Sequence, residues 1–539
     1  MIEVTRDNFE DVFPSIEYAI RTADFIAIDS EFSGLHFHDD DKPSLFDSGS
    51  DRYSKLRRSI QKFTLFQIGL STFCGDVNTN RYQTQTFQFY LFPRSFASHD
   101  QRLSLQASSI QFLRKHKFDF NKWLHDGISY LNCVDEKKVK DLVEVGVLNR
   151  DLDRQMDEKE IQSLCSHVAA WIPTSQPGDI LTLPTDKNFA DSLYVFHKDL
   201  RAQFPQIWTS TNAFDQVVVK RVTPTERRMS QKRDLDGDDR YQQQLLNEML
   251  GFSRVFRLLL SARKPIVGHN MLMDLMFMFD KFHMPLPEKY ETFKLCIREV
   301  FPVIFDTKHI HLCIKKKLEL LGVVHARSLE ELHNILASER VMNMSLLQPT
   351  ILRQNEVSAD GDEFHNAGYD SFVCGSVFLR LCHFLHSKNF SSMDIMPFAF
   401  NSYLPTMNTF RNCVNVIRAS VTHTKLDGAD PASLRPPFLY VKLKSGFPLF
   451  LESMLAQKLS PYGTVDIQFL SSTEALVATM NYMSARDIIY AFKQDPVIEV
   501  TNYRYWQHSP LAQKLWWGGF FSVAAASCAV ILNLLQRSS

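Results

Sequence analysis

The sequence predicts a mixed α/β fold, because apolar runs of strand length alternate with longer stretches of helical periodicity. The run FIAID at residues 25–29 is apolar and ends in an acid, as a buried central strand does. Two further runs, at 63–70 and 86–92, are expected to pair beside it. Helical patterns follow at 108–115 and 245–261. These observations predict a sheet covered by helices.

The 539 residues exceed what one hydrophobic core usually holds, so several domains are expected. Between residues 151 and 244 the composition changes and ends in the charged run ERRMSQKRDLDGDDR. This stretch predicts an insertion with a solvated linker. It would divide the first domain into halves at residues 1–150 and 245–390.

Residues 400–506 predict a separate α+β unit. The strand FLYVKLK begins an order of β-α-β-β-α-β, the split β-α-β pattern of an RNA-recognition-motif-like domain. Tyr440 is present on this first strand, but the later strand ALVATMN has no aromatic residue on which a base can stack. A packing or protein-docking role is therefore favoured over RNA reading.

Charge and cysteine content indicate a folded protein of a reducing compartment. The formal net charge is only −1, so attraction to nucleic acid has to come from local patches. The nine scattered cysteines, an odd number, argue against a disulfide framework. The first 20 residues lack the apolar core of a signal peptide.

Residues 515–535, reading LWWGGFFSVAAASCAVILNLL, contain no charged side chain. A helix of this length spans about 30 Å of hydrocarbon, and Trp516 and Trp517 stand where interfacial aromatics lie. We expect a single C-terminal transmembrane helix that holds the other domains in the cytosol, on the mitochondrial outer membrane or the endoplasmic reticulum. The alternative is a buried hydrophobic helix at a domain end.

Three short motifs carry the candidate chemistry. Asp29 and Glu31 are two residues apart on a strand, so both carboxylates face the same side. Asp274 follows Asn270 by one helical turn. His365 and Asp370 are five residues apart, with the small residues Ala367 and Gly368 between them leaving room for a substrate or metal.

Each motif alone also has an ordinary structural interpretation, because acids often follow strands and His269 and Asn270 can cap a helix. Together, however, they supply four carboxylates and a histidine. Carboxylates are the hard oxygen ligands that Mg²⁺ prefers, and two such ions activate a water and neutralise a leaving 3′-oxygen. With an ordinary pKa of about 6.5, His365 suits removal of the water proton.

In this order the motifs resemble the DEDDh exonucleases of the ribonuclease H-like fold. The similarity to poly(A)-specific ribonuclease and its deadenylase relatives covers both nuclease halves and, weakly, the later α+β unit. It is carried by DSEFSGL, QIGLSTF, SSIQFLRKHKFDFNKWLHDGISYLN, GFSRVFRLLLSARKPIVGHNMLMD, FPVIFDTK and HNAGYD. This resemblance implies a 3′-to-5′ exoribonuclease that uses two Mg²⁺ ions, for which Mn²⁺ can substitute.

The resemblance also implies residue roles. It makes Asp29, Glu31, Asp274 and Asp370 the metal ligands and His365 the general base. Lys308 would contact phosphate, and Phe32 and Leu35 would pack on sugars and bases. The full set of implied substrate-binding residues is Phe32, Leu35, Ile110, His269, Asn270 and Lys308.

Two departures from the soluble deadenylases narrow the implied function. The insertion occupies the place of a small nucleic-acid-binding domain but lacks its arginine and histidine motif, which puts adenine preference in doubt. The apolar C-terminal segment is absent from those deadenylases. Both features resemble the membrane-bound branch of the family, whose members trim precursors of PIWI-interacting RNAs.

For that branch the implied substrate is single-stranded RNA held by a PIWI protein and presented by a Tudor and KH domain scaffold. Two alternatives stay open. One is a general deadenylase of messenger RNA. The other is a catalytically dead, membrane-tethered RNA-binding scaffold, against which the intact set of five catalytic positions argues.

Overall fold

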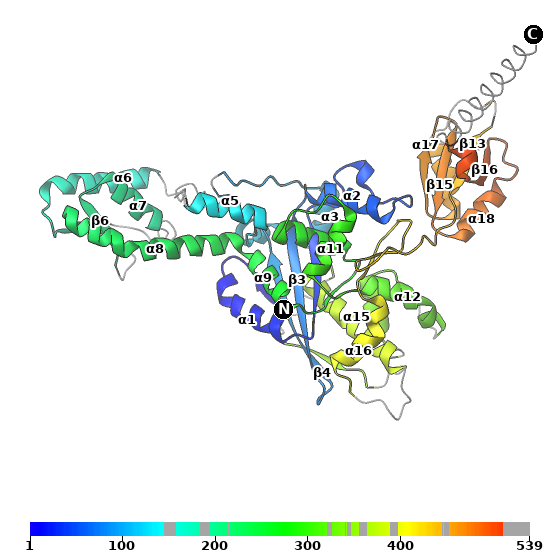
Figure 1. Cartoon of the computed structure of the whole chain (residues 1–539), viewed down its shortest axis with the longest axis horizontal. Coiled ribbons are helices and arrows are strands. Elements are labelled where there is room, and N and C mark those ends of the chain that lie inside the picture. Colours follow the sequence, from blue (N-terminus) through cyan, green and yellow to red (C-terminus); the bar gives the residue numbers. More distant parts are fainter. Residues whose placement is uncertain are drawn as a thin grey trace, which may run out of the picture. The chain divides into compact units, whose positions relative to one another are not determined.

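The structure is a computed structural model, and it divides into two compact units, each formed from two separate stretches of chain. The first contains Met1–Phe37 and Leu56–Val414, and the second contains His38–Lys55 and Asn415–Ser539 (Figure 1). The residues described are 1–96, 98–144, 158–183, 193–212, 216–320, 326–339, 341, 347–354, 364–388, 397–444, 446, 452–509 and 512.

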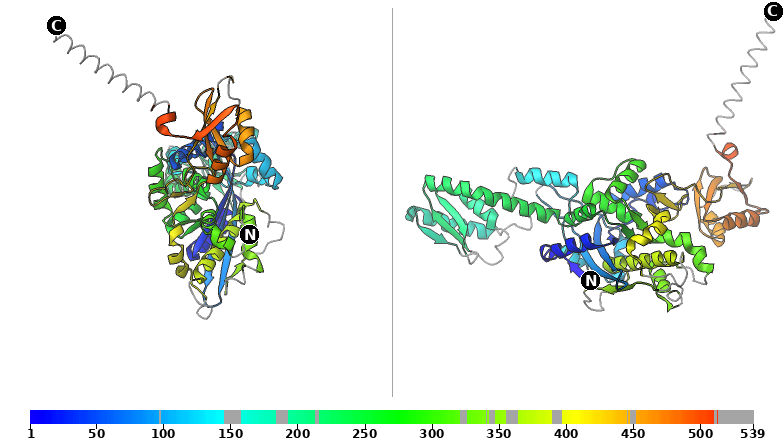
Figure 2. Two further views of the ribbon diagram at one scale, coloured as in Figure 1. Left: turned by 90° about the vertical axis from the view of Figure 1, so that its right-hand side faces the viewer. Right: turned by 60° about the horizontal axis from the view of Figure 1, so that its bottom comes forward.

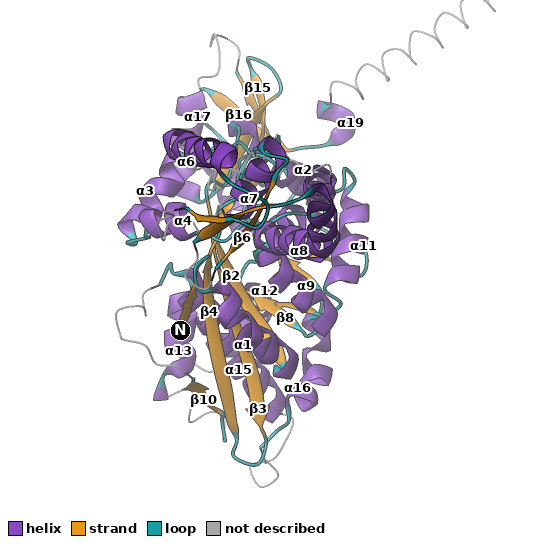
Figure 3. Cartoon of the chain, turned by 90° about the vertical axis from the view of Figure 1, so that its left-hand side faces the viewer, coloured by secondary structure: helices purple, strands orange, loops and turns teal. Residues whose placement is uncertain are grey.

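A seven-stranded mixed sheet forms the centre of the first unit. Six strands follow in the order β1-β4-β3-β2-β8-β9, and β10 also pairs with β4. Figure 3 shows β2, β3 and β4 side by side. Strands from both predicted nuclease halves therefore join one sheet. The strands are β1 (Ile2–Val4), β2 (Phe25–Phe32), β3 (Leu65–Asp76), β4 (Arg81–Tyr90), β8 (Ile266–Gly268), β9 (Ile304–Asp306) and β10 (Thr350–Arg353).

Strand β2 lies in the middle of the sheet, between antiparallel β3 and parallel β8, as its apolar sequence predicted. Its residues 25–28 are at most 1% exposed although successive side chains point to opposite faces, so both faces are covered. Helix α15 packs across β2 and β3. The helices around this sheet are α1 (Phe9–Thr22), α3 (Ala107–Lys115), α4 (Phe120–Asp126), α5 (Cys133–Glu144), α9 (Phe252–Ala262), α10 (Leu272–Met278), the π-helix η5 (Phe279–His283), α11 (Tyr290–Val300), α12 (Thr307–Leu320), α13 (Leu329–Ala337), α15 (Ala367–Ser387), α16 (Phe400–Met407) and the short η7 (Asn408–Phe410).

The insertion forms a small three-stranded antiparallel sheet in the order β5-β7-β6, with its own apolar core. The charged run expected to be a linker is instead part of one 27-residue helix, α8, unbroken in the right-hand view of Figure 2. A capping box of Thr223 with Glu226 begins this helix, and Gly251, at a φ of 36°, ends it. The elements are α6 (Glu158–Trp171), η3 (Ile172–Thr174), β5 (Ile180–Thr182), α7 (Leu193–Gln203), β6 (Ile207–Thr211), β7 (Val217–Arg221) and α8 (Pro224–Leu250).

The second unit has a four-stranded antiparallel sheet in the order β14-β15-β13-β16, and its elements follow the predicted order β-α-β-β-α-β. Tyr440 on β13 is covered by His508, whose ring stacks on it at 4.2 Å between centroids. The elements are β13 (Leu439–Leu443), α17 (Glu452–Leu459), η8 (Ser460–Tyr462), β14 (Val465–Phe469), β15 (Glu474–Thr479), α18 (Tyr482–Ala491), β16 (Ile498–Asn502) and α19 (Tyr505–His508), with η1 (Asp39–Asp41), α2 (Gly49–Ile60), β11 (Cys413–Asn415) and β12 (His423–Lys425) near the unit boundaries.

Residues 38–55, which follow β2 in sequence, are held within the second unit by a buried ion pair. Arg52 donates to Asp47 through Nε and Nη2, at 3.1 and 3.0 Å. The same guanidinium donates to the carbonyl oxygens of Ile417 and Arg418, at 2.6 and 2.7 Å. These bonds join the two stretches of chain that make up the unit.

The sequence predicted a transmembrane helix at 515–535, a segment that lies outside the residues described. None of the described helices combines the length and the apolar character that a bilayer crossing requires. This finding argues against the predicted membrane location. The predicted enzymatic function does not require an anchor.

Candidate active site

Three of the four predicted carboxylates meet at the end of β2. Oxygen atoms of Asp29, Glu31 and Asp370 all lie within 4.8 Å of one another. Asp29 and Glu31 are half-buried on β2, whereas Asp370 is buried in the first turn of α15. Asp274, buried in the first turn of α10, is close enough for its charge to raise the pKa of Asp29 and of Glu31. The structure thus brings the four carboxylates together from three elements.

The packing of α15 against β3 determines where Asp370, in the first turn of α15, lies relative to β2. A Cβ atom at Gly69 would stand 1.8 Å from the carbonyl oxygen of Ala367, so only glycine allows α15 to begin there. Beside it, Gln67 accepts a hydrogen bond from the backbone N–H of Ala367 at 3.0 Å. Asp29 and Glu31 pair in register with Gly69 and Gln67.

The small residues at the start of α15 serve packing, not space for a ligand as the sequence suggested. A Cβ at Gly368 would lie 2.5 Å from the sulfur of Met1 and 2.8 Å from the side-chain oxygen of Gln88. Asn366 caps the helix, its side chain accepting from the backbone N–H groups of Gly368 and Tyr369 at 3.1 and 3.3 Å.

Burial and mutual repulsion shift these carboxylates strongly. Burial, followed by the charges of neighbouring acids, raises the pKa of Asp29 and of Glu31 well above the ordinary range. Burial raises the pKa of Asp274 and of Asp370 to about 7. Oδ1 of Asp370 is buried with no hydrogen-bond partner among the residues described. Crowded, desolvated carboxylates with a free oxygen are a donor set that fits divalent cations.

His365 lies beside the cluster, in a strained backbone conformation with a φ of 71°. Its backbone N–H donates to Asp370 at 2.9 Å. Its ring packs against Phe112 and His116 of the α3 region, with centroids 4.9 and 4.1 Å away. Burial and the charge of His116 lower the pKa of His365, so the imidazole is neutral at neutral pH.

The first three predicted substrate-binding residues lie on and after β2 and on α3. Phe32 is half-buried and stacks on Phe277 of α10, with centroids 4.6 Å apart. Leu35 is 41% exposed, and its backbone N–H donates to the side chain of Gln106 at 2.8 Å. Ile110 is half-buried and packs on an aromatic cluster under α3. Gln106, which the sequence analysis did not single out, thus joins the Leu35 loop to the start of α3.

The other three, His269, Asn270 and Lys308, lie where β8 and β9 end. His269 Nδ1 lies 2.8 Å from the hydroxyl oxygen of Thr307, which donates to the carbonyl of Gly268 at 3.1 Å. Burial lowers the pKa of His269 to about 3, so this histidine is neutral. Lys308 donates through Nζ to the carbonyl of Arg327 at 2.7 Å.

Comparison with known proteins identifies the family. The model of the CAF1 family ribonucleases matches residues 4–378, which contain all four carboxylates and His365. The chain belongs to the CAF1 ribonuclease family. Its mixed α/β fold is accordingly the ribonuclease H-like fold of that family, and nucleases of the family depend on divalent metal ions.

Relatives of this ribonuclease match along nearly the whole chain. Poly(A)-specific ribonuclease PNLDC1 of Mus musculus is 34% identical over 94% of this chain and 95% of its own length. The pre-piRNA 3′-exonuclease trimmer of Bombyx mori is 29% identical over 98% of each chain. Poly(A)-specific ribonuclease PARN of Homo sapiens is 28% identical over 88% of this chain and 76% of its own length. The chain is a 3′-to-5′ exoribonuclease related to the poly(A)-specific ribonucleases, which confirms the predicted enzyme class.

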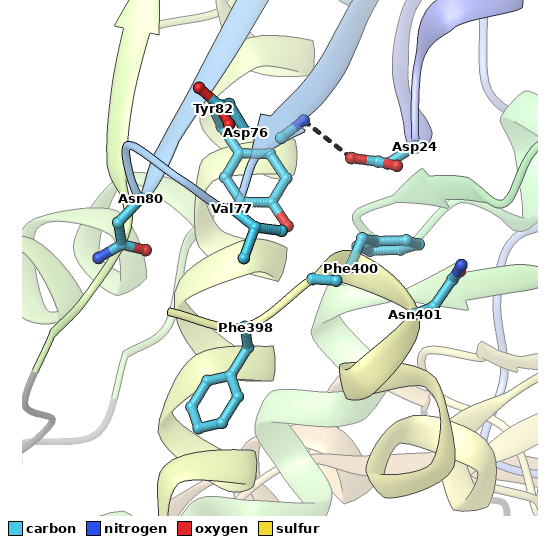
Figure 4. A pocket seen from close by; sticks show the side chains of 10 residues that line it. Asp24, Asp76, Val77, Asn80, Tyr82, Phe398, Phe400 and Asn401 are labelled. Atoms are coloured by element: carbon cyan, nitrogen blue, oxygen red, sulfur yellow. Dashed lines mark hydrogen bonds between the residues drawn. The ribbon is translucent and has the colours of Figure 1, made fainter. Parts of the chain in front are cut away.

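A separate cavity of this ribonuclease, of about 80 Å³, lies at the opposite end of β2 (Figure 4). Asp24, just before the strand, accepts the backbone N–H of Gly75 there at 2.8 Å, and Tyr82 and Phe400 line the wall. None of the predicted site residues lines this cavity. The carboxylate cluster, rather than this cavity, is therefore the candidate active site.

Proposed function

We propose that this CAF1 family ribonuclease trims the 3′ ends of PIWI-interacting RNA precursors to their mature length. The supporting observation is similarity over 98% of both chains to the silkworm protein named as a pre-piRNA 3′-exonuclease trimmer. The mouse relative matches over nearly the same extent, so the similarity includes the insertion and the C-terminal α+β unit as well as the nuclease sheet.

Asp29, Glu31, Asp274 and Asp370 are the proposed holders of two Mg²⁺ ions, or of Mn²⁺ in their place. The raised pKa values of these acids and the buried Oδ1 of Asp370 support this assignment. The chemistry that such cations supply when bound is a water of lowered pKa and neutralisation of charge on the leaving 3′-oxygen. The Asp370 side chain is positioned by a hydrogen bond from the N–H of His365 and by the packing of α15 against β3.

His365 is the proposed general base. Its lowered pKa keeps the imidazole unprotonated at neutral pH, as acceptance of a proton from the attacking water requires. Contacts with Phe112 and His116 restrict the ring.

The residues around the cluster are the proposed binding site for the 3′-terminal nucleotides. Lys308 supplies a cation for phosphate, whereas His269 is neutral and offers hydrogen bonding without charge. Phe32 and the exposed Leu35 offer apolar surface to sugars and bases, and Ile110 and Asn270 complete the set.

The proposed substrate is single-stranded RNA carried by a PIWI protein and presented by a Tudor and KH domain scaffold. With a formal net charge of −1 the chain has no strong overall attraction for RNA. Presentation by a partner raises the local concentration of the RNA end, so weak intrinsic affinity is enough.

The second candidate function is general deadenylation of messenger RNA, which the name of the mouse relative, a poly(A)-specific ribonuclease, favours. A catalytically dead RNA-binding scaffold is the candidate of another class. The convergence of Asp29, Glu31 and Asp370 argues against it, because a buried acidic cluster without a metal destabilises a fold.

Degradation of oligo(A) and of mixed-sequence RNA of equal length, each with a 3′-hydroxyl and Mg²⁺, separates these functions. Trimming predicts comparable rates on both RNAs, whereas a strong oligo(A) preference would support the deadenylase. Asp29→Ala is the matched inactive control. If that variant degrades RNA as fast as the parent, the proposed metal site is wrong.

A further inference from the structure

Asp306 is a fully buried carboxylate that has no role among the residues discussed so far. It is the last residue of β9, and 0% of it is exposed. An unpaired charge in such a position is costly, so the groups that surround it reveal its purpose.

Those groups are backbone amides from two separate segments. Oδ1 of Asp306 accepts the N–H groups of Asn270 and Lys308, both at 2.9 Å. The same oxygen accepts from His309 at 3.3 Å, and Oδ2 accepts from Met271 at 3.2 Å. A single side chain therefore binds four amides.

The two segments are the beginnings of α10 and α12. Amides at a helix start have no partner within the helix and carry partial positive charge, so a carboxylate is stabilised there. One segment leads to Asp274 in the first turn of α10, and the other contains Lys308. Asp306 thus joins the helix that carries a metal-site carboxylate to the helix that carries the proposed phosphate-binding lysine.

The bond to Asn270 also fixes an uncommon backbone conformation. Asn270 has a φ of 60°, in the left-handed region that asparagine adopts more readily than most non-glycine residues. The hydrogen bond from its N–H to Asp306 holds the backbone there. The neighbouring residue, His269, is fixed in turn through Thr307, which follows Asp306.

We propose that Asp306 is a positioning residue of the exonuclease, which sets the relative placement of Asp274, His269, Asn270 and Lys308 through their backbone segments. The inference rests on the substrate and metal roles proposed above. We assign Asp306 a positioning role because its oxygens accept hydrogen bonds from these four backbone amides.

Asp306→Asn tests this with little change in volume, since it replaces one acceptor oxygen by an NH₂ group that opposes the amide donors. Asp280→Asn is the matched control. Asp280 is also buried and also accepts a backbone N–H, from Leu286 at 3.2 Å, and it pairs with Lys281 at 3.0 Å, but it binds neither segment. Asp306→Glu restores the charge with an altered reach.

The first measurement, amide hydrogen exchange in the full chain without RNA or metal, does not depend on activity. In Asp306→Asn the amides of Asn270, Met271 and Lys308 are expected to exchange about tenfold faster or more, whereas in Asp280→Asn they match the parent. Unchanged exchange in a folded Asp306→Asn variant, or equal acceleration in the control, would overturn the proposal.

The second measurement is steady-state hydrolysis of a 3′-hydroxyl RNA with Mg²⁺. We expect Asp306→Asn to lower kcat/KM by about tenfold to a hundredfold, with a higher KM, Asp306→Glu to recover part of the loss, and Asp280→Asn to stay near the parent. Parent-like kcat/KM in Asp306→Asn contradicts the positioning role. A parent that degrades no RNA overturns the proposed function, and the exchange data then still decide whether Asp306 fixes both segments.

Discussion

Gly69 of β3 and Ala367 of α15 are in such close contact that a Cβ atom at position 69 would stand 1.8 Å from the Ala367 carbonyl oxygen. This contact sets the distance between the sheet and the helix that carries Asp370. Because Gly69 pairs in register with Asp29, the same point fixes both sides of the acidic cluster.

Gly69→Ala is therefore expected to displace the start of α15. The overpacking should lower the free energy of unfolding by about 1 to 3 kcal/mol, measured by denaturant unfolding, and reduce exonuclease activity more than that loss explains. Gly428→Ala is the control, since its added methyl would meet one side-chain atom at 3.6 Å. Full activity in Gly69→Ala would show that the cluster tolerates the shift.

Asp274→Asn is expected to stabilise the metal-free protein at alkaline pH. The folded carboxyl has a pKa of about 7 and the unfolded chain has an ordinary pKa of about 4, so between these values the folded chain binds a proton that the unfolded chain has lost. Parent stability should therefore fall as pH rises from about 4 through about 7. At pH 8 the variant should have a higher melting temperature than the parent. Its free energy of unfolding should be larger by an amount on the order of 1 to 3 kcal/mol.

At pH 5 the difference between Asp274→Asn and the parent should shrink, because the parent carboxyl is then protonated. Adding Mn²⁺ at pH 8 should raise the melting temperature of the parent more than that of the variant, and a chelator should reverse the gain. A variant that melts below the parent in metal-free buffer at pH 8 would contradict the proposed repulsion.

His365→Ala is expected to lower kcat by about 10² to 10⁴, because the water proton loses its proposed acceptor. Mn²⁺ binding, followed by titration calorimetry, should stay close to the parent, since the four carboxylates are unchanged. His125→Ala, at an exposed histidine of α4, is the control for loss of a surface imidazole. Equal rates for parent and His365→Ala would assign the proton to another group.

Arg52→Met should destabilise the second unit by about 1 to 3 kcal/mol, because it removes the guanidinium that binds the buried Asp47 carboxylate and leaves Lys55, at 2.8 Å, as the cationic partner. Unfolding followed by hydrogen exchange of residues 38–55 measures the change. Arg486→Ala, which breaks an exposed pair with Asp487, should alter stability by less than about 1 kcal/mol. If both substitutions lower stability by similar amounts, the buried pair contributes no more to stability than the exposed pair.

Local patterns predicted what depends on neighbours in sequence. The alternation of side chains on a strand correctly put Asp29 and Glu31 on one side, and the apolar run before them indicated a central strand. The packing of His365 on Phe112 and His116 joins residues about 250 positions apart, which no periodicity reveals. The requirement for glycine at position 69 could not be predicted either, because it depends on where α15 packs against β3.

Other features left a detectable signal. The charged run was interpreted as a linker because its composition is that of a solvated segment, yet Thr223, Pro224 and Glu226 form the pattern that begins a helix. Asp306 ends the apolar run of FPVIFDTK just as Asp29 ends FIAID, a signal that the sequence analysis did not use. Only the structure shows that this one binds amides.

The second unit also imposes an order on the synthesis of the protein. Its two stretches, His38–Lys55 and the part after Asn415, are separated by about 360 residues of nuclease. At roughly 5 to 20 residues per second, a ribosome needs roughly 20 to 70 seconds to travel from one to the other. Throughout that interval the carbonyls of Ile417 and Arg418, which bind Arg52, have not yet been synthesised, so the segment after β2 completes its packing only late in translation.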